Sequence, residues 1–344
     1  IDSDVDHDGD TILPPPIEQV DIIFVVDNSG SMHHEHMILA EQVQVMFEEL
    51  ISPTDGADGR TPPAVTDLHV GVITTDMGTH GYTLMTCDNP MSGDGGVLQD
   101  VGIGEGCDST YSAAGCPRSH CPWLVHSAEH PDDGTDATNP PIWEDFGCIA
   151  TLGTDGCGFE QQLEASLVAL TTQTETGRPN EGFLRPDSLL AVIYVTDEDD
   201  CSTGDAEMFN PARDDLGNLG VRCALREDRL HPVDRYHTAF LGLRPGRENL
   251  VVVAAITGVP IDGTWNPGDP IDRLRELRQV DPTNPNTLLP SCETAMGLAF
   301  PPVRLVELVY LFGGNGILES ICRSDWTPAL QAITRKIQSR MVGE

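Results

Sequence analysis

The sequence predicts an α/β fold with a doubly wound, mainly parallel sheet and helices on both of its faces. Short apolar runs rich in β-branched residues are typical of strands that are buried on both faces. These runs alternate with segments whose apolar residues recur at helical spacing, and the alternation continues from about residue 20 to 341. Strands and helices that alternate in this way favour a parallel sheet.

Each predicted element has its own pattern. The predicted strands are residues 20–26, 68–75, 188–196, 249–257 and 317–322. The predicted helices are residues 34–50, 159–170, 302–312 and 328–341. In the first helix, for example, apolar side chains recur at helical spacing from Met37 through Val43 to Leu50.

The chain has 344 residues, a length that would allow two domains. We nevertheless predict one domain over 18–344, because the alternation of strands and helices is not interrupted. The excess length falls in long disulfide-rich insertions at about 77–157, 198–232 and 259–291, which hold most of the cysteines. Residues 1–17 form a separate acidic segment.

The composition is strongly acidic. The formal charge is -36, from 55 acidic against 19 basic residues. Such a surface repels nucleic acid and anionic lipid headgroups, so we expect no nucleic-acid partner. It suits divalent cations or basic partners, or simply keeps the protein in solution. No apolar run approaches the roughly 20 residues needed to span a bilayer, so we expect no membrane span.

The ten cysteines include no C-x-x-C pair and lie mostly in loops rich in Gly, Pro and Asp. This pattern predicts disulfides formed in an oxidising compartment. Cys201–Cys223 and Cys292–Cys322 are the pairings that we expect from proximity in the sequence. The chain begins at Ile1 without a charged and apolar leader, so we expect that a secretory signal was removed. The predicted location is extracytoplasmic: secreted, on the cell surface or anchored at the outer membrane.

A zinc site is the alternative use of some of these cysteines. Its candidate ligands are Cys116, His120, Cys121, His126 and His130. They lack the paired spacing of a zinc finger, so the disulfide interpretation is preferred.

The N-terminal segment places acids at every second position. Asp4, Asp6 and Asp8, followed by Gly9 and Asp10, match the first half of a calcium-binding loop. The glutamate expected at the twelfth position of such a loop is replaced by Pro15. The segment is therefore either an acidic linker or a calcium site.

Acids also follow three of the predicted strands: Asp27, Asp76 and Asp197. Ligands of open α/β sheets bind beyond the carboxyl ends of the strands, where these acids would gather. Asp27-Asn-Ser29-Gly-Ser31 puts three oxygen-bearing side chains at alternate positions of a turn. Carboxylates and hydroxyls suit a hard divalent cation: Mg²⁺ first, with Mn²⁺ or Ca²⁺ as alternatives.

Asp27-x-Ser29-x-Ser31 after a buried strand, with Asp197 at the end of a later strand in YVTD, resembles the metal-ion-dependent adhesion site of the von Willebrand factor type A family. The resemblance implies a doubly wound sheet and covers about residues 18–341. It implies that Ser29 and Ser31 ligate the ion through their hydroxyls. Asp27 and Asp197 would lie close by, partly through water, and a partner's acid would take one open position.

The same resemblance leaves one metal-site residue undecided. The family's threonine from a third loop would be Thr154, with Glu160 as the alternative. VVDNSGSM, GCGFEQQLEA and the W-x-P-A-L of the tail resemble, in style, the secreted or lipid-anchored type A proteins of Gram-negative bacteria.

The residues around the site depart from the family's pattern. Glu198 stands where the family has a glycine, and Asp199 and Asp200 follow it. These carboxylates either hold a second ion or make the site less receptive to an acidic partner. His33, His34 and His36 fall in the first turn of the following helix, at the expected rim, where they would at most modulate binding.

The predicted function is an adhesion or binding module that engages its partner through the cation. The expected partner is a protein or an acidic polysaccharide that supplies a carboxylate. The alternative is a structural subunit of a cell-surface assembly that self-assembles, with the ion in a structural role. Metal-dependent hydrolysis is a minor alternative. We expect no enzyme, because the serines lie in N-S-G-S and not in the G-x-S-x-G of a nucleophile elbow.

Overall fold

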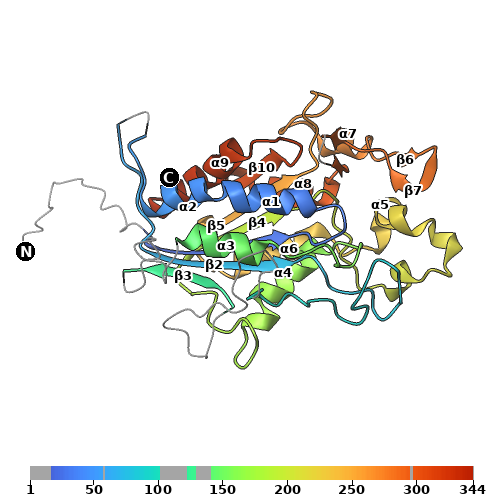
Figure 1. Cartoon of the computed structure of the whole chain (residues 1–344), viewed down its shortest axis with the longest axis horizontal. Coiled ribbons are helices and arrows are strands. Elements are labelled where there is room, and N and C mark those ends of the chain that lie inside the picture. The colour runs from blue at the N-terminus through green and yellow to red at the C-terminus, as the bar shows by residue number, and fades with distance from the viewer. Residues whose placement is uncertain (1–16, 57–58, 101–121, 129–140, 295–296, 344) are drawn as a thin grey trace, which may run out of the picture.

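The computed structural model describes residues 17–56, 59–100, 122–128, 141–294 and 297–343. Its centre is a six-stranded sheet in the order β10-β5-β4-β1-β2-β3 (Figure 1). The strands are β1 (Gln19–Val26), β2 (Asp67–Thr74), β3 (Leu124–Ser127), β4 (Leu189–Val195), β5 (Val251–Thr257) and β10 (Gly316–Ser320). Only the edge strand β3 pairs antiparallel within this sheet. The predicted α/β fold with a mainly parallel sheet is confirmed.

Helices cover both faces of the sheet. One face packs against α1 (His33–Gln42), α2 (Gln44–Ile51), α3 (Ile142–Ala150) and α9 (Thr327–Met341). The other face packs against α4 (Gln162–Leu170), α6 (Val233–Gly242) and α8 (Val303–Leu311). Smaller elements lie outside these layers: α5 (Arg222–Leu225), α7 (Ile271–Arg275), and the strand pairs β6 (Val280–Asp281) with β7 (Asn284–Leu288) and β8 (Cys292–Glu293) with β9 (Leu298–Ala299).

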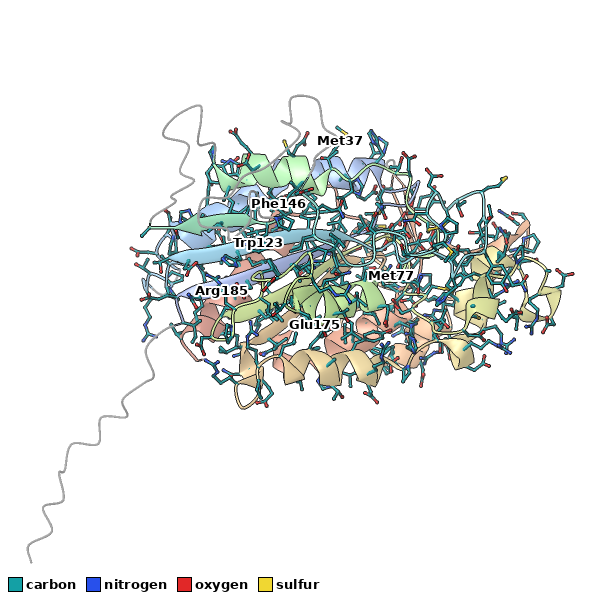
Figure 2. All side chains as sticks on the ribbon, turned by 90° about the horizontal axis from the view of Figure 1, so that it is seen from below. Met37, Met77, Trp123, Phe146, Glu175 and Arg185 are labelled. Carbon is teal, nitrogen blue, oxygen red and sulfur yellow. A yellow bond between two sulfur atoms is a disulfide. The ribbon has the colours of Figure 1, made fainter. Side chains whose placement is uncertain are left out.

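The continuous apolar runs of the strands follow from this double cover. Along β1, Ile22 and Phe24 belong to the core under α1, α2, α3 and α9. Ile23 and Val25 point to the opposite face and belong to the core against α4, α6 and α8. Phe146 of α3, labelled in Figure 2, meets Phe24 with 4.6 Å between ring centroids. A strand that is buried on both faces needs apolar residues at every position.

Several predicted boundaries shift. The predicted helix 34–50 is two helices, α1 and α2, on either side of Val43. The predicted helix 159–170 begins only at Gln162, because the residues before it form a loop at the sheet edge. Within the predicted insertion 77–157, the structure places β3 and α3, and the apolar residues of α3 belong to the core.

Disulfides fix the loops of the described chain. Cys87–Cys157, Cys201–Cys223 and Cys292–Cys322 are bonded, and no described cysteine is free. The two pairings expected from sequence proximity are thereby confirmed. Of the zinc alternative, only His126 lies among the described residues. No helix of the described chain is long and apolar enough to cross a membrane.

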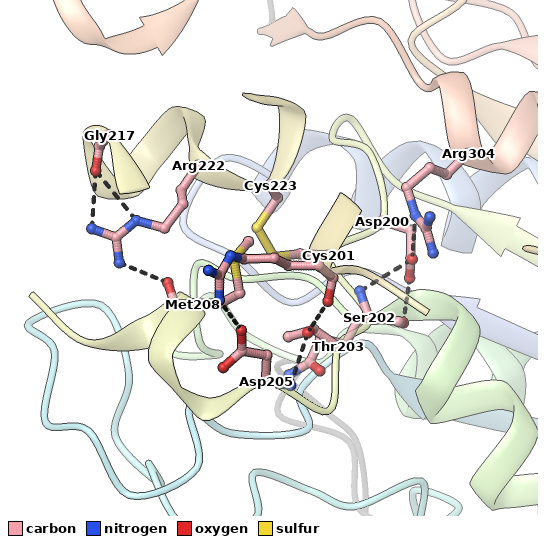
Figure 3. The surroundings of a disulfide bond; sticks show 12 residues. Asp200, Cys201, Ser202, Thr203, Asp205, Met208, Gly217, Arg222, Cys223 and Arg304 are labelled. Carbon is pink, nitrogen blue, oxygen red and sulfur yellow. Dashed lines mark hydrogen bonds and ion pairs between the residues drawn. A yellow bond between two sulfur atoms is a disulfide. The ribbon is translucent and has the colours of Figure 1, made fainter. Parts of the chain in front are cut away.

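Figure 3 shows how the loop around Cys201–Cys223 is held. Arg222 is only 1% exposed. Its guanidinium donates to backbone carbonyls of the same loop, including those of Met208 and Gly217, at 2.9 Å each. These bonds satisfy the buried donors of Arg222 and give the loop an ordered interior.

Candidate functional site

Sheet topology brings the ends of β1 and β4 together. From β1, the chain builds one half of the sheet through β2 and β3 and the other half through β4, β5 and β10. Ligands of open α/β sheets bind at such a switch point. Val26 and Val195 are register partners, so Asp27 and Thr196 leave the sheet side by side. The Asp27 amide donates to Val195 O at 3.0 Å, and Thr196 Oγ1 donates to Asp27 Oδ2 at 2.6 Å.

The loop after β1 turns its oxygens toward this point. Asp27 is fully buried, and its Oδ1 accepts the Ser29 amide at 2.8 Å. The hydroxyl oxygens of Ser29 and Ser31 are 3.2 Å apart. Ser31 is exposed while Ser29 is buried, so this pair lies where the buried acid meets solvent. The structure therefore brings the three predicted ligands of this loop together.

Asp197, the first residue beyond Thr196, belongs to the same cluster. Its side chain accepts a hydrogen bond from Ser31, and it is only 3% exposed. Its Oδ1 is buried and has no hydrogen-bond partner. Burial, together with repulsion from Asp27 and Glu198, raises the pKa of Asp197 well above its usual range. Among the described residues, no basic side chain forms an ion pair with Asp197, so its ionised form has no compensating charge there.

Glu160 and Glu198 form a second acidic pair beside Asp27. Their carboxyl groups lie close enough to affect each other's pKa. Glu160 is 2% exposed, and its Oε1 has no partner. Burial, with repulsion from Glu198 and Asp27, raises the pKa of Glu160 well above its usual range. Burial and the charge of Asp27 raise the pKa of Glu198 to about 7.

Of the two candidates for the remaining position, Glu160 interacts with Asp27, whereas Thr154 has no described hydrogen bond to the Asp27 loop. The Gly156 amide donates to Asn28 O at 3.0 Å, so the loop that carries both residues rests on the Asp27 loop. The charge of Asp27 is one of the causes that raise the pKa of Glu160. Thr154 is half-buried, and among the described contacts no hydrogen bond joins it to Asp27 or to the two serines.

Asp76 has a different environment from Asp27 and Asp197. Its Oδ1 accepts the Gly78 amide at 2.8 Å, and its Oδ2 accepts the Cys157 amide at 3.3 Å. It lies beside Cys87–Cys157, with ligand atoms within 4.8 Å of one another, but the bonded sulfurs offer no thiolate. Burial raises the pKa of Asp76, and the acid that acts on it is Asp94. Asp76 thus connects two loops outside the Asp27 cluster.

The Asp76 group is the only described set of three acidic, sulfur or imidazole ligands that lie within 4.8 Å of one another. Asp27, Asp197, Glu160 and Glu198 therefore form no cage made of carboxylates alone. An ion at the switch point must also take hydroxyl oxygens and water. Mg²⁺ commonly binds in this way, through one or two carboxylates with several waters retained.

Asp199 and Asp200, the last two acids of the DEDD run, form ion pairs with arginines. Asp200 Oδ2 accepts Arg304 Nε at 3.0 Å, as Figure 3 shows. Asp199 accepts the Arg304 amide at 2.9 Å and is ion-paired with Arg278. Neither acid is free for an ion, so only Glu198 of the three extra carboxylates faces Asp27.

The three histidines separate into two kinds. His33 and His34 are exposed at the start of α1, as the sequence predicts for a rim. His36 differs from that expectation: it is only 2% exposed, and its Nε2 lies 2.6 Å from Asp27 O. Burial lowers the pKa of His36, so the neutral ring donates to the carbonyl and helps to hold the loop. The candidate calcium ligands Asp4, Asp6, Asp8 and Asp10 lie outside the described residues.

Oxygen atoms without partners concentrate at this edge. Eight buried side-chain oxygens of the described residues have no hydrogen-bond partner, and all but that of Gln173 lie near the carboxyl ends of the strands. They belong to Asn28, Glu35, Thr75, Glu160, Gln162, Asp197 and Thr257. Unsatisfied buried oxygens are costly, and a hard cation with its waters satisfies several at once. The donor set therefore fits a divalent cation.

Comparisons with known proteins identify no family. No model of a known protein family matches the sequence, and no curated protein matches it significantly. Solved structures that resemble the chain include proximal thread matrix protein 1 from the mussel byssus, at 11% identity and a TM-score of 0.36. The human COPII-coat protein Sec24c is also similar, at 11% identity and a TM-score of 0.33. The matches cover 94% and 95% of this chain, but only 49% and 33% of those chains.

Proposed function

We propose that this chain is a von Willebrand factor type A-like binding module that engages a partner through a divalent cation at the switch point of its sheet. The observation that carries the proposal is the meeting of the Asp27-x-Ser29-x-Ser31 loop with Asp197, whose buried Oδ1 has no partner among the described residues. Ser29 and Ser31 would ligate the ion through their hydroxyls. Asp27 and Asp197 would balance its charge, and Glu160 would occupy the corner that the family gives to a threonine.

The protein's own groups hold this site in shape. Thr196 and the Ser29 amide orient the Asp27 carboxylate from two sides. Ser31 keeps the cluster accessible, because it is exposed where the other ligands are buried. A bound Mg²⁺ would supply a coordination position for an oxygen of the partner, such as a carboxylate of a protein or an acidic polysaccharide. Affinity for the partner would then depend on the supply of the ion.

Binding is a better proposal than hydrolysis. A serine nucleophile needs an adjacent base. Ser29 Oγ contacts Ser31 Oγ, and no described histidine bonds to either hydroxyl. The nearest buried imidazole, that of His36, is already committed to Asp27 O.

An extracytoplasmic location is part of the proposal. Three disulfides close loops of the described chain, and disulfides persist in oxidising compartments. The excess of acids over bases also suits an environment in which divalent cations are abundant.

The test is the thermal stability of metal-stripped protein titrated with Mg²⁺, Mn²⁺ and Ca²⁺. An ion present at about 100 times its dissociation constant should stabilise the native chain by roughly 2.7 kcal/mol. Asp27→Ala and Asp197→Ala should remove this response and any metal-dependent capture of a partner. Asp187→Ala is the matched control, because Asp187 is an exposed aspartate at the opposite end of β4.

Retention of the full metal response by both site variants would contradict the proposal. If the ion stabilises the chain but drives self-assembly instead of capture, the structural-subunit function replaces the binding function. Sedimentation of the purified chain with and without Mg²⁺ separates these two results.

A further inference from the structure

We propose that the acidic N-terminal segment, residues 1–16, docks in a pocket beside the basic end of α9, at the edge of the sheet where the parallel strands begin. The segment itself lies outside the described residues, and the described chain begins at Ile17. The candidate metal site lies at the opposite edge, beyond the carboxyl ends of the strands. This docking therefore does not depend on the proposed function.

The described chain begins next to the end of α9. The amide of Ile17 donates to Met341 O at 2.8 Å. A pocket of about 430 Å³ lies next to this point, between α9 and the loop that precedes β2. Its lining residues include Pro62, Pro63, Arg335, Gln338 and Val342. The volume is within the range of ligand-binding pockets, and residues 1–16 are tethered directly beside it.

The pocket borders a basic surface in a strongly acidic chain. The last two turns of α9 carry Arg335, Lys336 and Arg340, and the helix contains no acidic residue. The guanidinium of Arg340 donates to oxygens of Asn315 and Gly314, which are neutral groups. No described acid forms an ion pair with any of these three bases. Their charges are therefore available to an anionic group from outside the described residues.

The N-terminal segment matches this surface in charge and in apolar character. Aspartates stand at positions 2, 4, 6, 8 and 10, and Ile12, Leu13 and three prolines follow them. The apolar part suits a pocket that is lined by Pro62 and Pro63. The aspartates suit the bases of α9, because surfaces of opposite charge attract each other.

The tether is long enough, and it favours this occupant over another molecule. Asp10 stands seven residues before Ile17, and an extended chain of that length spans up to about 23 Å. Arg335 stands six residues before Met341, a distance of about 9 Å along the helix axis. A short tether gives an effective concentration on the order of mM. A separate acidic molecule would have to compete with a segment that is always present.

The experiment uses Lys336, which is the only lysine of the chain and adjoins Arg335. A water-soluble carbodiimide activates a carboxyl group, and the Lys336 amine then attacks the carboxyl carbon. An amide forms, and the carbodiimide leaves as a urea. Burial and the charge of Arg340 lower the pKa of Lys336, which favours the reactive unprotonated amine. The reaction joins only groups in contact, so mass spectrometry of the digested full chain identifies the acids that meet Lys336.

The expected product is an intramolecular amide between Lys336 and an aspartate among residues 2–10. Arg335→Gln should lower the initial rate of this cross-link by about two- to five-fold, the usual effect of one surface charge. Arg323→Gln is the matched control and should leave the rate unchanged, because Arg323 is an exposed arginine before the start of α9. Both variants should keep the melting temperature of the parent, since both positions are exposed.

The docking is overturned if Lys336 stays unmodified or joins mainly to a described acid such as Glu319, on which the charge of Arg335 acts. An equal rate in the parent and in Arg335→Gln would place the segment outside the pocket. A cross-link between two chains, seen as a covalent dimer, would show that the occupant belongs to a second copy. None of these results bears on the metal response of Asp27→Ala, so the proposed function is tested separately.

Discussion

A buried aspartate at the amino edge of the sheet is ion-paired with arginine, whereas one at the carboxyl edge is not. Asp21, near the start of β1, and Asp27, just beyond its end, are both fully buried. At the amino edge, Asp21 Oδ1 accepts Arg185 Nε at 2.8 Å, and Arg244 lies 3.7 Å from Oδ2. At the carboxyl edge, Asp27 has hydroxyl and amide donors. In the part of the chain that the structure describes, no arginine forms an ion pair with Asp197, Glu160 or Glu198.

The two edges differ in whether the charge of a buried acid is compensated by the protein's own side chains. The acid at the amino edge is compensated within the protein, and Ser188 and the Arg185 amide complete its hydrogen bonds. The chain has arginines for this purpose, since Arg278 and Arg304 neutralise Asp199 and Asp200 close to the carboxyl edge. That Asp27, Asp197, Glu160 and Glu198 receive none is consistent with a cation supplied from outside.

The largest expected effect lies at the amino edge. Asp21→Ala leaves Arg244, which is 1% exposed, without the carboxylate that it faces. Removal of one partner of a buried ion pair costs about 3–5 kcal/mol. We expect this loss of unfolding free energy in urea titrations, with the same value in Mg²⁺ and in EDTA. A loss that depends on Mg²⁺ would show that the two edges are coupled. It would contradict the claim that Asp21 is compensated independently of the carboxyl edge.

The pH dependence of the metal-free protein should give the next largest effect. Burial raises the pKa of Glu198 to about 7 and that of Glu160 and Asp197 well above their usual range. The folded state then holds more protons than the unfolded state, so this stabilisation is complete below about pH 4.5 and is lost as pH rises through about 7. We expect a loss on the order of 2 kcal/mol in EDTA.

Mg²⁺ should reduce this loss, because the ion binds the ionised carboxylates and binds more tightly as they lose protons. Urea titrations between pH 4.5 and 8, with and without Mg²⁺, measure both slopes. Glu198→Gln serves as the control and should flatten the slope in EDTA. A metal-free stability that rises over this range would show that the acids are compensated after all.

The smallest effect concerns the side chain that positions Asp27. Thr196→Val removes the hydroxyl that donates to Asp27 Oδ2 and accepts from Gln162. Loss of such a supporting contact typically weakens metal binding about 10-fold or more, or roughly 1.4 kcal/mol. We expect this shift in the Mg²⁺ dissociation constant, with rescue by Thr196→Ser.

Thr154→Ala is the comparison for this variant. Thr154 has no hydrogen bond to the Asp27 loop among the described contacts, so its removal should change Mg²⁺ affinity by less than roughly 0.5 kcal/mol. A larger effect would return Thr154 to the ligand set in place of Glu160.

Local patterns were enough for much of the fold. The strands were predictable because burial on both faces demands an unbroken apolar run, and such runs are visible in the sequence. Helix α3 was not predicted from the sequence, because Gly147 and Cys148 lie in a segment whose composition is typical of a loop. Its contact with α1, which lies about a hundred residues earlier in the chain, decides that it is a helix of the core.

The clustering of the candidate ligands in one loop could be predicted from the sequence alone. Asp27, Ser29 and Ser31 follow a buried strand at alternate positions of one turn, so their meeting depends only on neighbouring backbone. Asp197 was predictable for the related reason that parallel strands end at the same edge.

The sequence could not tell which of the remaining acids lack a partner, because those partners come from distant segments of the folded chain. Asp199 and Asp200 are neutralised by arginines about 80 to 100 residues away in sequence, and no local pattern encodes those partners. Asp76 is held by the amides of Gly78 and Cys157, and the latter reaches it through the folding of a distant loop. Charge in a sequence is a property of residues, whereas compensation of charge is a property of contacts, and contacts between distant segments form only in the folded chain.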